Sequence, residues 1–196
     1  MPLPARIPDK TLNAEIERLL YQSKVVREEA EGLVWGLSDD QFNWSPGPGQ
    51  WSLGQCIDHL NVAGRQMLEK MEVAIREARA AGILGEGPYA YGFFSRWFLR
   101  LMQPPVKRRF KAPPKFQPSP RLKMTDVLAE WGRIHTRLED LLHDASGLDL
   151  ARIKITSPVN SLIRYPLGVA FWIQLAHDRR HLWQGRNVRN LPVFPQ

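Results

Sequence analysis

The strongest constraint on the fold is the repeat of apolar residues at helical spacing along four long segments. In the first segment, residues 9–37, the repeating positions are Leu12, Ile16, Leu19, Val26, Ala30, Leu33 and Leu37. Spacings of three and four place such side chains on one face of an α-helix. A chain with several such faces must bury them against one another, so the sequence predicts an all-α protein.

The second and third helices are predicted over residues 52–81 and from residue 125 to about residue 145. Ser52 followed by Gln55 forms a capping box that begins the second helix. Thr125 is the predicted N-cap of the third. In the third helix the apolar steps alternate between four and three, which is typical of a bundle seam.

The fourth helix is predicted from Pro166 to Gly185, since proline favours the first helical position and glycine often follows the last. Residues 167–176 are apolar nearly all round, which is typical of a deeply buried helix. Four long helices predict a four-helix bundle.

The segment from residue 85 to residue 121, between the second and third helices, is too long for an ordinary connection. Its first part predicts a short amphipathic helix with one apolar side, formed by Phe93, Phe94, Trp97, Phe98, Leu101 and Met102. Its second part is rich in proline and predicted to be extended. The many aromatic residues favour a segment that docks on the bundle. Residues 153–164 contain several isoleucines, but Pro158 argues against a strand.

Composition places the chain among globular proteins, with 43% hydrophobic and 24% charged residues. We expect a single domain over residues 1–196, with residues 85–121 as an insertion. Cys56 is the only cysteine, so an intramolecular disulfide is excluded and a cytoplasmic location is expected. The first residues have no apolar run typical of a secretory signal, and no stretch is apolar enough to span a membrane.

The net charge of +7 comes from one local segment. Residues 96–123 contain nine Lys or Arg and no Asp or Glu, while the rest of the chain is slightly acidic. A nucleic-acid-binding module would also show a recognisable motif, and none is found. We therefore expect no nucleic-acid partner, and the segment is interpreted first as a solvated basic loop.

Histidines carry the strongest functional signal. His177 and His181 stand four residues apart in the fourth helix, which places both imidazoles on one face. That face points inward, and two buried imidazoles need a partner that a metal ion would supply. His59 lies beside the apolar stripe of the second helix with small neighbours. A third imidazole from a facing helix would complete a site with one open position, as in catalytic metal sites.

The remaining histidines and the cysteine are interpreted as structural. His135 flanks the apolar stripe of the third helix, and His143 is predicted to be exposed near that helix's C-terminus. Cys56 lies one turn before His59 and could act as a soft ligand, but a buried lone cysteine is more often a small hydrophobe.

Four polar residues are predicted to support the site or bind substrate: Gln55, Gln174, Asp178 and Arg180. Gln55 and Gln174 each lie one helical turn before a histidine, and Asp178 is placed to orient His181. Arg180 could receive a carboxylate, with a solvent-facing arginine as the alternative. Asp58 also neighbours a histidine, but no general base can be assigned.

Two stretches resemble the DinB-like superfamily. The first, LSDDQFNWSPGPGQWSLGQCIDHL, resembles a signature in which a tryptophan and a Pro-Gly turn precede a WS motif, with a metal histidine seven residues after the serine. The second, HDRRHLWQGRNV, is similar to the histidine pair of the last bundle helix. Their order and spacing agree with the helical pattern between them.

The resemblance implies a four-helix bundle with a divalent metal, commonly zinc or nickel, held by His59, His177 and His181. It also implies a small-molecule substrate and, commonly, a homodimer. Similar proteins include S-transferases and isomerases that use low-molecular-weight thiols, and others described as metal-dependent hydrolases. The basic segment 85–121 lies outside both signatures.

Both chemistries follow from one such site, because a divalent metal with three neutral ligands acidifies a bound water and a bound thiol alike. The missing general base favours thiol transfer slightly over hydrolysis. Two alternatives stay open at this point. One is a non-catalytic metal-binding or interaction bundle, and the other is a surface-binding protein that uses residues 96–123 towards anionic lipid or nucleic acid.

Overall fold

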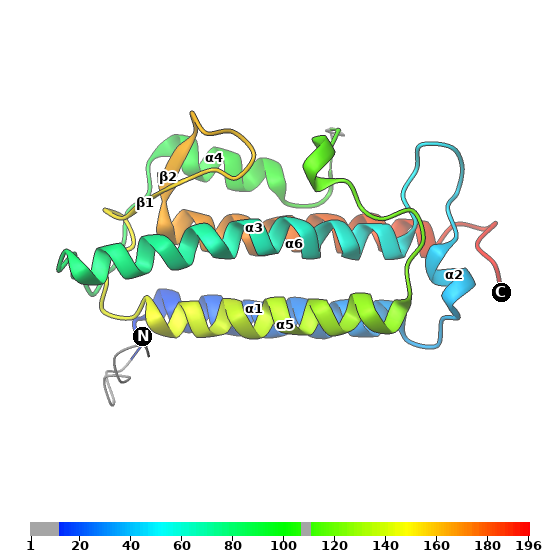
Figure 1. The fold of residues 1–196 in the computed structure, drawn as a ribbon, viewed down its shortest axis with the longest axis horizontal. Helices are drawn as coiled ribbons and strands as arrows, with labels where there is room; N and C mark the ends of the chain where they lie inside the picture. Colours follow the sequence, from blue (N-terminus) through cyan, green and yellow to red (C-terminus); the bar gives the residue numbers. More distant parts are fainter. Residues whose placement is uncertain (1–11, 107–110) are drawn as a thin grey trace.

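The computed structural model describes residues 12–106 and 111–196, and the described chain is mostly helical, as predicted. Four long helices lie alongside one another in two layers (Figure 1): α1 (Ala14–Val34), α3 (Leu53–Ala80), α5 (Met124–Asp144) and α6 (Leu167–Arg189). Helices α3 and α6 each pack against a neighbour in their own layer and one in the other, and so do α1 and α5. Each helix therefore turns one broad face inward. No helix among the described residues is long and apolar enough to cross a membrane.

The core is built from the apolar stripes that the sequence indicates. In α1, Ile16, Leu19 and Val26 are fully buried. Helix α6 is buried around most of its circumference in its first half, including Leu167, Val169 and Phe171. Helix α6 therefore has little solvent-facing surface over that half, which explains its nearly continuous apolar sequence.

Helix starts agree with the sequence where a capping box is present and differ where it is absent. The Ser52 side chain accepts from the Gln55 backbone N–H, and Gln55 returns a bond to the Ser52 N–H, so α3 begins as predicted. Helix α5 begins at Met124, and Thr125 is not its N-cap. The Met124 N–H is bound instead by Asp39 of the short helix α2 (Asp39–Asn43), a contact from a distant part of the chain.

The first predicted helix is shorter than expected. Asn13 is the N-cap of α1 and accepts from the N–H groups of Glu15 and Ile16. The predicted residues 9–11 lie outside the described residues. Pro166 was predicted to open the fourth helix, but it directly precedes α6, which begins at Leu167.

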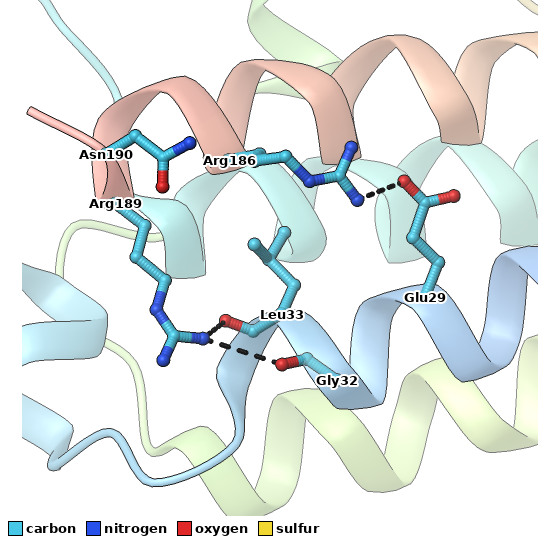
Figure 2. Close-up of a pocket in the computed structure, with 6 residues that line it drawn as sticks. All are labelled: Glu29, Gly32, Leu33, Arg186, Arg189 and Asn190. Carbon is cyan, nitrogen blue, oxygen red and sulfur yellow. Dashed lines mark hydrogen bonds and ion pairs between the residues drawn. The ribbon is translucent and has the colours of Figure 1, made fainter.

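The prediction that Gly185 ends the fourth helix is wrong, because α6 continues to Arg189. A Cβ atom at Gly185 would lie 3.4 Å from Leu53 and 3.5 Å from Leu33, which are ordinary packing distances, so this buried glycine is an interior residue of the helix. The extra turn places Arg189 against the end of α1, where it donates to the carbonyls of Gly32 and Leu33 (Figure 2). Helix α1 has no basic residue in its own last turn, so Arg189 satisfies carbonyls that would otherwise lack partners.

Residues 154–166 form a short antiparallel hairpin, although Pro158 argued against a strand in this region. Strands β1 (Lys154–Thr156) and β2 (Arg164–Pro166) pair with Ile155 opposite Tyr165. Pro158 lies in the loop between the strands, outside the ladder, so its missing N–H costs no pairing.

The insertion between α3 and α5 is anchored to the bundle, as the sequence favoured. It contains α4 (Phe93–Met102), which contacts α6, and the single-turn helix η1 (Pro114–Phe116), which contacts α3. Leu99 of α4 packs against the core, but every aromatic side chain of α4 is exposed. The insertion therefore docks without burying its aromatic side.

Candidate metal centre

Three histidines converge between α3 and α6. One ring nitrogen from each of His59, His177 and His181 lies within 4.8 Å of the other two. The Nε2 atoms of His59 and His177 are 3.3 Å apart. The ring centroid of His181 is 4.6 Å from that of His59 and 4.7 Å from that of His177. The sequence predicted this set of residues, and the fold places them within reach of one ion.

Helix packing explains the convergence. His177 and His181 lie one turn apart on α6, and His59 lies on the buried face of α3. The helices approach closely near Gly64, where a Cβ atom would lie 2.9 Å from Ile134 of α5 and 3.6 Å from Gln174 of α6. Substitution of this glycine would push the helices apart beside the histidines.

A backbone contact sets the tautomer of His59. Its Nδ1 lies 2.6 Å from the carbonyl oxygen of Phe116 in η1. A carbonyl can only accept, so Nδ1 carries the proton and donates it. The lone pair of His59 is therefore on Nε2, the atom that faces His177. A histidine held this way is typical of metal ligands, whose second nitrogen is commonly bound to a carbonyl or carboxylate.

All three imidazoles are held in the neutral form. Burial, together with the neighbouring His59 and Arg180, lowers the pKa of His177 to about 3. Burial also lowers the pKa of His181 and of His59. Neutral imidazole is the form that binds a metal ion, so the cluster needs no deprotonation at pH 7 before it can coordinate one.

The donor set fits a divalent transition metal. Two imidazoles on one tetrahedral zinc ion at about 2.0–2.1 Å have their nitrogens about 3.3 Å apart, which is the separation between His59 and His177. Imidazole ligands suit zinc and nickel. His181 supports the fit, because its buried Nδ1 has no hydrogen-bond partner within residues 12–106 and 111–196.

Two residues that the sequence analysis did not place in the site lie against the histidines. The ring of Trp51 is 4.8 Å from His59 and 5.7 Å from His181, so it covers one side of the cluster. Its position directly before the helix-capping Ser52 could have indicated this role. Phe116 gave no such signal, because it acts through its backbone and reaches His59 from 57 residues away.

Gln55 and Asp58 do not touch the histidines but hold the segment that does. The Asp58 carboxylate accepts from the Ser119 N–H at 2.8 Å, and the Gln55 amide donates to the Ser119 carbonyl at 3.3 Å. Gln66 donates to the Lys115 carbonyl in the same way. We name residues 112–121 the strap, because side chains of α3 fasten it beside His59.

The expectation that Asp178 orients His181 is corrected by the structure. Asp178 is fully buried and accepts from Gln174 through Oδ1 at 2.9 Å, while its Oδ2 lies 3.7 Å from Nε2 of His135. Burial raises the pKa of Asp178 and lowers that of His135 to about 3. His135 also bonds Ser23 at 3.0 Å. His135 and Asp178, which we call the inner pair, form a separate buried polar group with Gln174 and Ser23.

Arg180 is buried, contrary to the solvent-facing alternative. It donates to the Leu101 carbonyl at the end of α4 at 3.4 Å, and so links α6 to the insertion. Cys56 is fully buried, and burial raises the pKa of its thiol, as expected of a small hydrophobe. His143 is exposed in the last turn of α5, as predicted.

A pocket of about 410 Å³ lies elsewhere, between the ends of α1 and α6 (Figure 2). Its walls include the Glu29–Arg186 ion pair at 2.5 Å and Arg189. None of the three clustered histidines lines it. Its charges are already paired, so we do not assign it to the candidate metal centre.

A family comparison agrees with this geometry. The model of the DinB superfamily matches residues 22–184, which include all three clustered histidines and the whole insertion. The chain belongs to the DinB superfamily, as its two signature stretches indicated. No match was found among curated proteins or among solved structures.

Proposed function

We propose that this protein is a metal-dependent enzyme that holds a divalent ion, zinc or nickel, through His59, His177 and His181. The observation that carries the proposal is the convergence of three neutral imidazoles from α3 and α6, with nitrogens within 4.8 Å. Three protein ligands leave a coordination position for a small molecule. The four long helices would then form the bundle typical of the superfamily, as one domain over residues 1–196.

The chain's own residues prepare the site for such an ion. Phe116 fixes the tautomer of His59, and Trp51 shields one side of the cluster from water. A divalent ion held by neutral ligands keeps its full charge and acidifies a water or thiol bound to it. The strap already holds the His59 ring through the Phe116 carbonyl. Binding of an ion therefore costs little conformational entropy at this residue.

We propose thiol transfer to a small electrophilic substrate as the reaction, with hydrolysis as the second candidate. A hydrolase normally needs a general base near the nucleophile. Asp58 is engaged by Ser119, and Asp178 by Gln174, with burial raising the pKa of Asp178. A low-molecular-weight thiol needs no such base once it is ionised, because the thiolate is itself the nucleophile. We further propose that Arg180, next to His181 in α6, attracts a carboxylate of the thiol or substrate.

The proposal is tested with the full chain loaded with zinc or nickel. A panel of low-molecular-weight thiols is incubated with electrophilic substrates, and ester and amide substrates are assayed in parallel. We expect thiol conjugation that requires metal and is lost in His177→Ala. His143→Ala removes an exposed histidine from α5 and is the matched control, with unchanged activity expected.

The outcomes of these assays distinguish thiol transfer, hydrolysis and a non-catalytic metal-binding role. Hydrolysis without thiol conjugation would select the second candidate. Stoichiometric metal with neither activity would favour the non-catalytic metal-binding role. No metal in the wild-type chain would overturn the proposal. Light scattering on the same samples tests the homodimer that the superfamily resemblance implies.

A further inference from the structure

We propose that α4 and the loop between β1 and β2 form a docking surface for a lipid bilayer that carries anionic headgroups. This inference does not depend on the metal centre. The surface is defined by exposed apolar residues of both elements: Phe93, Phe94, Trp97 and Phe98 of α4, with Val159, Leu162 and Ile163 of the loop.

Helix α4 presents its aromatic side to solvent. None of its ten residues is fully buried, and Phe94 is 82% exposed. The helix is nevertheless held in place, because Leu99 packs on the core and Arg180 binds the Leu101 carbonyl. The aromatic side is therefore not needed to fasten α4 to the bundle. Large exposed apolar groups of this kind mark interaction sites.

The hairpin loop adds a second apolar projection. Leu162 is 90% exposed, and Val159 and Ile163 are exposed beside it. The loop and α4 both stand on the side of the α3 and α6 layer that faces away from α1 and α5 (Figure 1). Lys115 of the strap donates to the Pro158 carbonyl, which ties the loop to the insertion. Both elements can therefore approach one flat surface together.

The charges around these residues have a single sign. The sequence contains no Asp or Glu from residue 87 to residue 125, or from residue 150 to residue 177. Exposed cations of the described residues within these stretches include Arg96, Arg100, Lys115, Lys154 and Arg164. Each cation near an anionic bilayer strengthens binding roughly fivefold. On α4 the two arginines border the aromatic residues, and Leu99 takes the core-facing side. Exposed aromatic residues bordered by cations are typical of helices that lie in the membrane interface.

Charge also selects a lipid surface over a second copy of the chain. A twofold contact places the same patch on both partners. Arg96 and Arg100 of one copy would then approach the same arginines of the other, without acidic partners from these stretches. Nucleic acid is disfavoured because bound bases stack on aromatics within a groove. The aromatic residues of α4 stand instead on the outer side of a helix.

The experiment measures flotation of the full chain with vesicles of phosphatidylcholine mixed with phosphatidylglycerol, and with vesicles of phosphatidylcholine alone. We expect binding to the mixed vesicles that weakens with added salt, and at least about tenfold weaker binding to phosphatidylcholine alone. Equal binding to both vesicles, or none to either, would overturn the proposal.

Two matched pairs of variants localise the surface. The double substitution Phe94→Ser with Trp97→Ser should weaken binding at least about tenfold, because it removes apolar groups from the interface. Trp35→Ser, at the C-cap residue that follows α1 and is also 82% exposed, should leave binding unchanged. Arg96→Glu should weaken binding several-fold, whereas Lys24→Glu, on α1, should not.

Far-ultraviolet circular dichroism and urea denaturation show that each variant is folded. Unchanged binding of a folded Phe94→Ser/Trp97→Ser protein would overturn the proposal. A dimer that this double substitution converts to monomers would assign the surface to a second copy instead. Tighter binding to single-stranded DNA than to the mixed vesicles would assign it to nucleic acid.

Discussion

The molecule buries histidines in two regions that differ in what their rings face. In the inner pair, His135 of α5 meets Ser23 of α1 and Asp178 of α6, so hydrogen bonding and a nearby carboxyl serve its ring. In the candidate metal centre, His59, His177 and His181 face mainly one another. Both regions share burial and lowered histidine pKa values.

The difference shows that burial alone does not identify a ligand. His135 is the most deeply buried of the histidines, yet its polar partners from two neighbouring helices, α1 and α6, give it a structural role. His59 donates from Nδ1 to the Phe116 carbonyl, and its Nε2 lone pair lies 3.3 Å from Nε2 of another imidazole, that of His177. A neutral His177 can donate an N–H to this lone pair or, in its other tautomer, present a second lone pair that a cation would bind. The predictions below separate the two regions.

The largest expected effect is on metal affinity. Removal of one of three ligands in His177→Ala should weaken binding of zinc or nickel by roughly a thousandfold, about 4 kcal/mol. Metal content of the purified protein and competition with a chelator measure this effect. His143→Ala and His135→Ala should both retain stoichiometric metal, and unchanged metal in His177→Ala would contradict the ligand assignment.

Loss of His135 should act on stability instead. His135→Ala leaves a cavity beside Trp131, whose ring is 4.1 Å away, and deprives Asp178 of its neighbour. We expect a loss of about 2–3 kcal/mol in the free energy of unfolding. Urea denaturation of the metal-free proteins measures it. A stability equal to wild type would show that the inner pair contributes nothing.

The burial of His135 should also make the free energy of unfolding depend on pH in the acid range. Burial lowers the pKa of folded His135 to about 3, whereas an unfolded histidine titrates near 6.5. The unfolded chain therefore binds the additional proton first, and this contribution to stability, complete above pH 6.5, is lost as the pH falls towards 3. The slope reaches about 1.4 kcal/mol per pH unit. Urea titrations of metal-free His135→Gln should show a smaller slope than wild type between pH 6 and pH 4; equal slopes would contradict the assignment.

The strap should have a smaller effect on the metal centre. Asp58→Ala removes the acceptor of the Ser119 N–H and loosens the segment that carries the Phe116 carbonyl. We expect about threefold to tenfold weaker metal binding, measured by chelator competition. Asp58→Asn keeps an acceptor oxygen and should restore most of the affinity. Failure of Asn to do better than Ala would remove the strap from the account.

Removal of the metal should have the smallest effect on the fold. The apolar faces of four helices form the core without any contribution from an ion. Far-ultraviolet circular dichroism should therefore be unchanged by a chelator, which would leave only a modest decrease in melting temperature. Complete unfolding by the chelator would show that the core depends on the ion.

Much of this organisation could be predicted from local sequence. Helical periodicity indicated four helices, and the Ser52–Gln55 capping box located the start of α3, because these signals depend on neighbours in the chain. The histidine set followed from spacing and from the family resemblance. Gly185 misled the prediction because it is a buried residue in the interior of α6, and a single sequence does not distinguish such a glycine from a helix stop.

Contacts between distant segments could not be predicted. The Phe116 carbonyl acts through the backbone, so no residue type indicates it. Asp178 was assigned to His181 by helical spacing, but its carboxylate turns towards α5, since His135 lies within reach there. Pro158 argued against a strand only because the loop position was unknown.

Anomalous scattering from a crystal of the purified protein tests the account most directly. Data collected on both sides of the zinc and nickel absorption edges should show one strong peak per chain, within about 2.0–2.2 Å of nitrogens from His59, His177 and His181. No peak at these rings in crystals grown with either metal, or a peak held by other residues, would contradict the account.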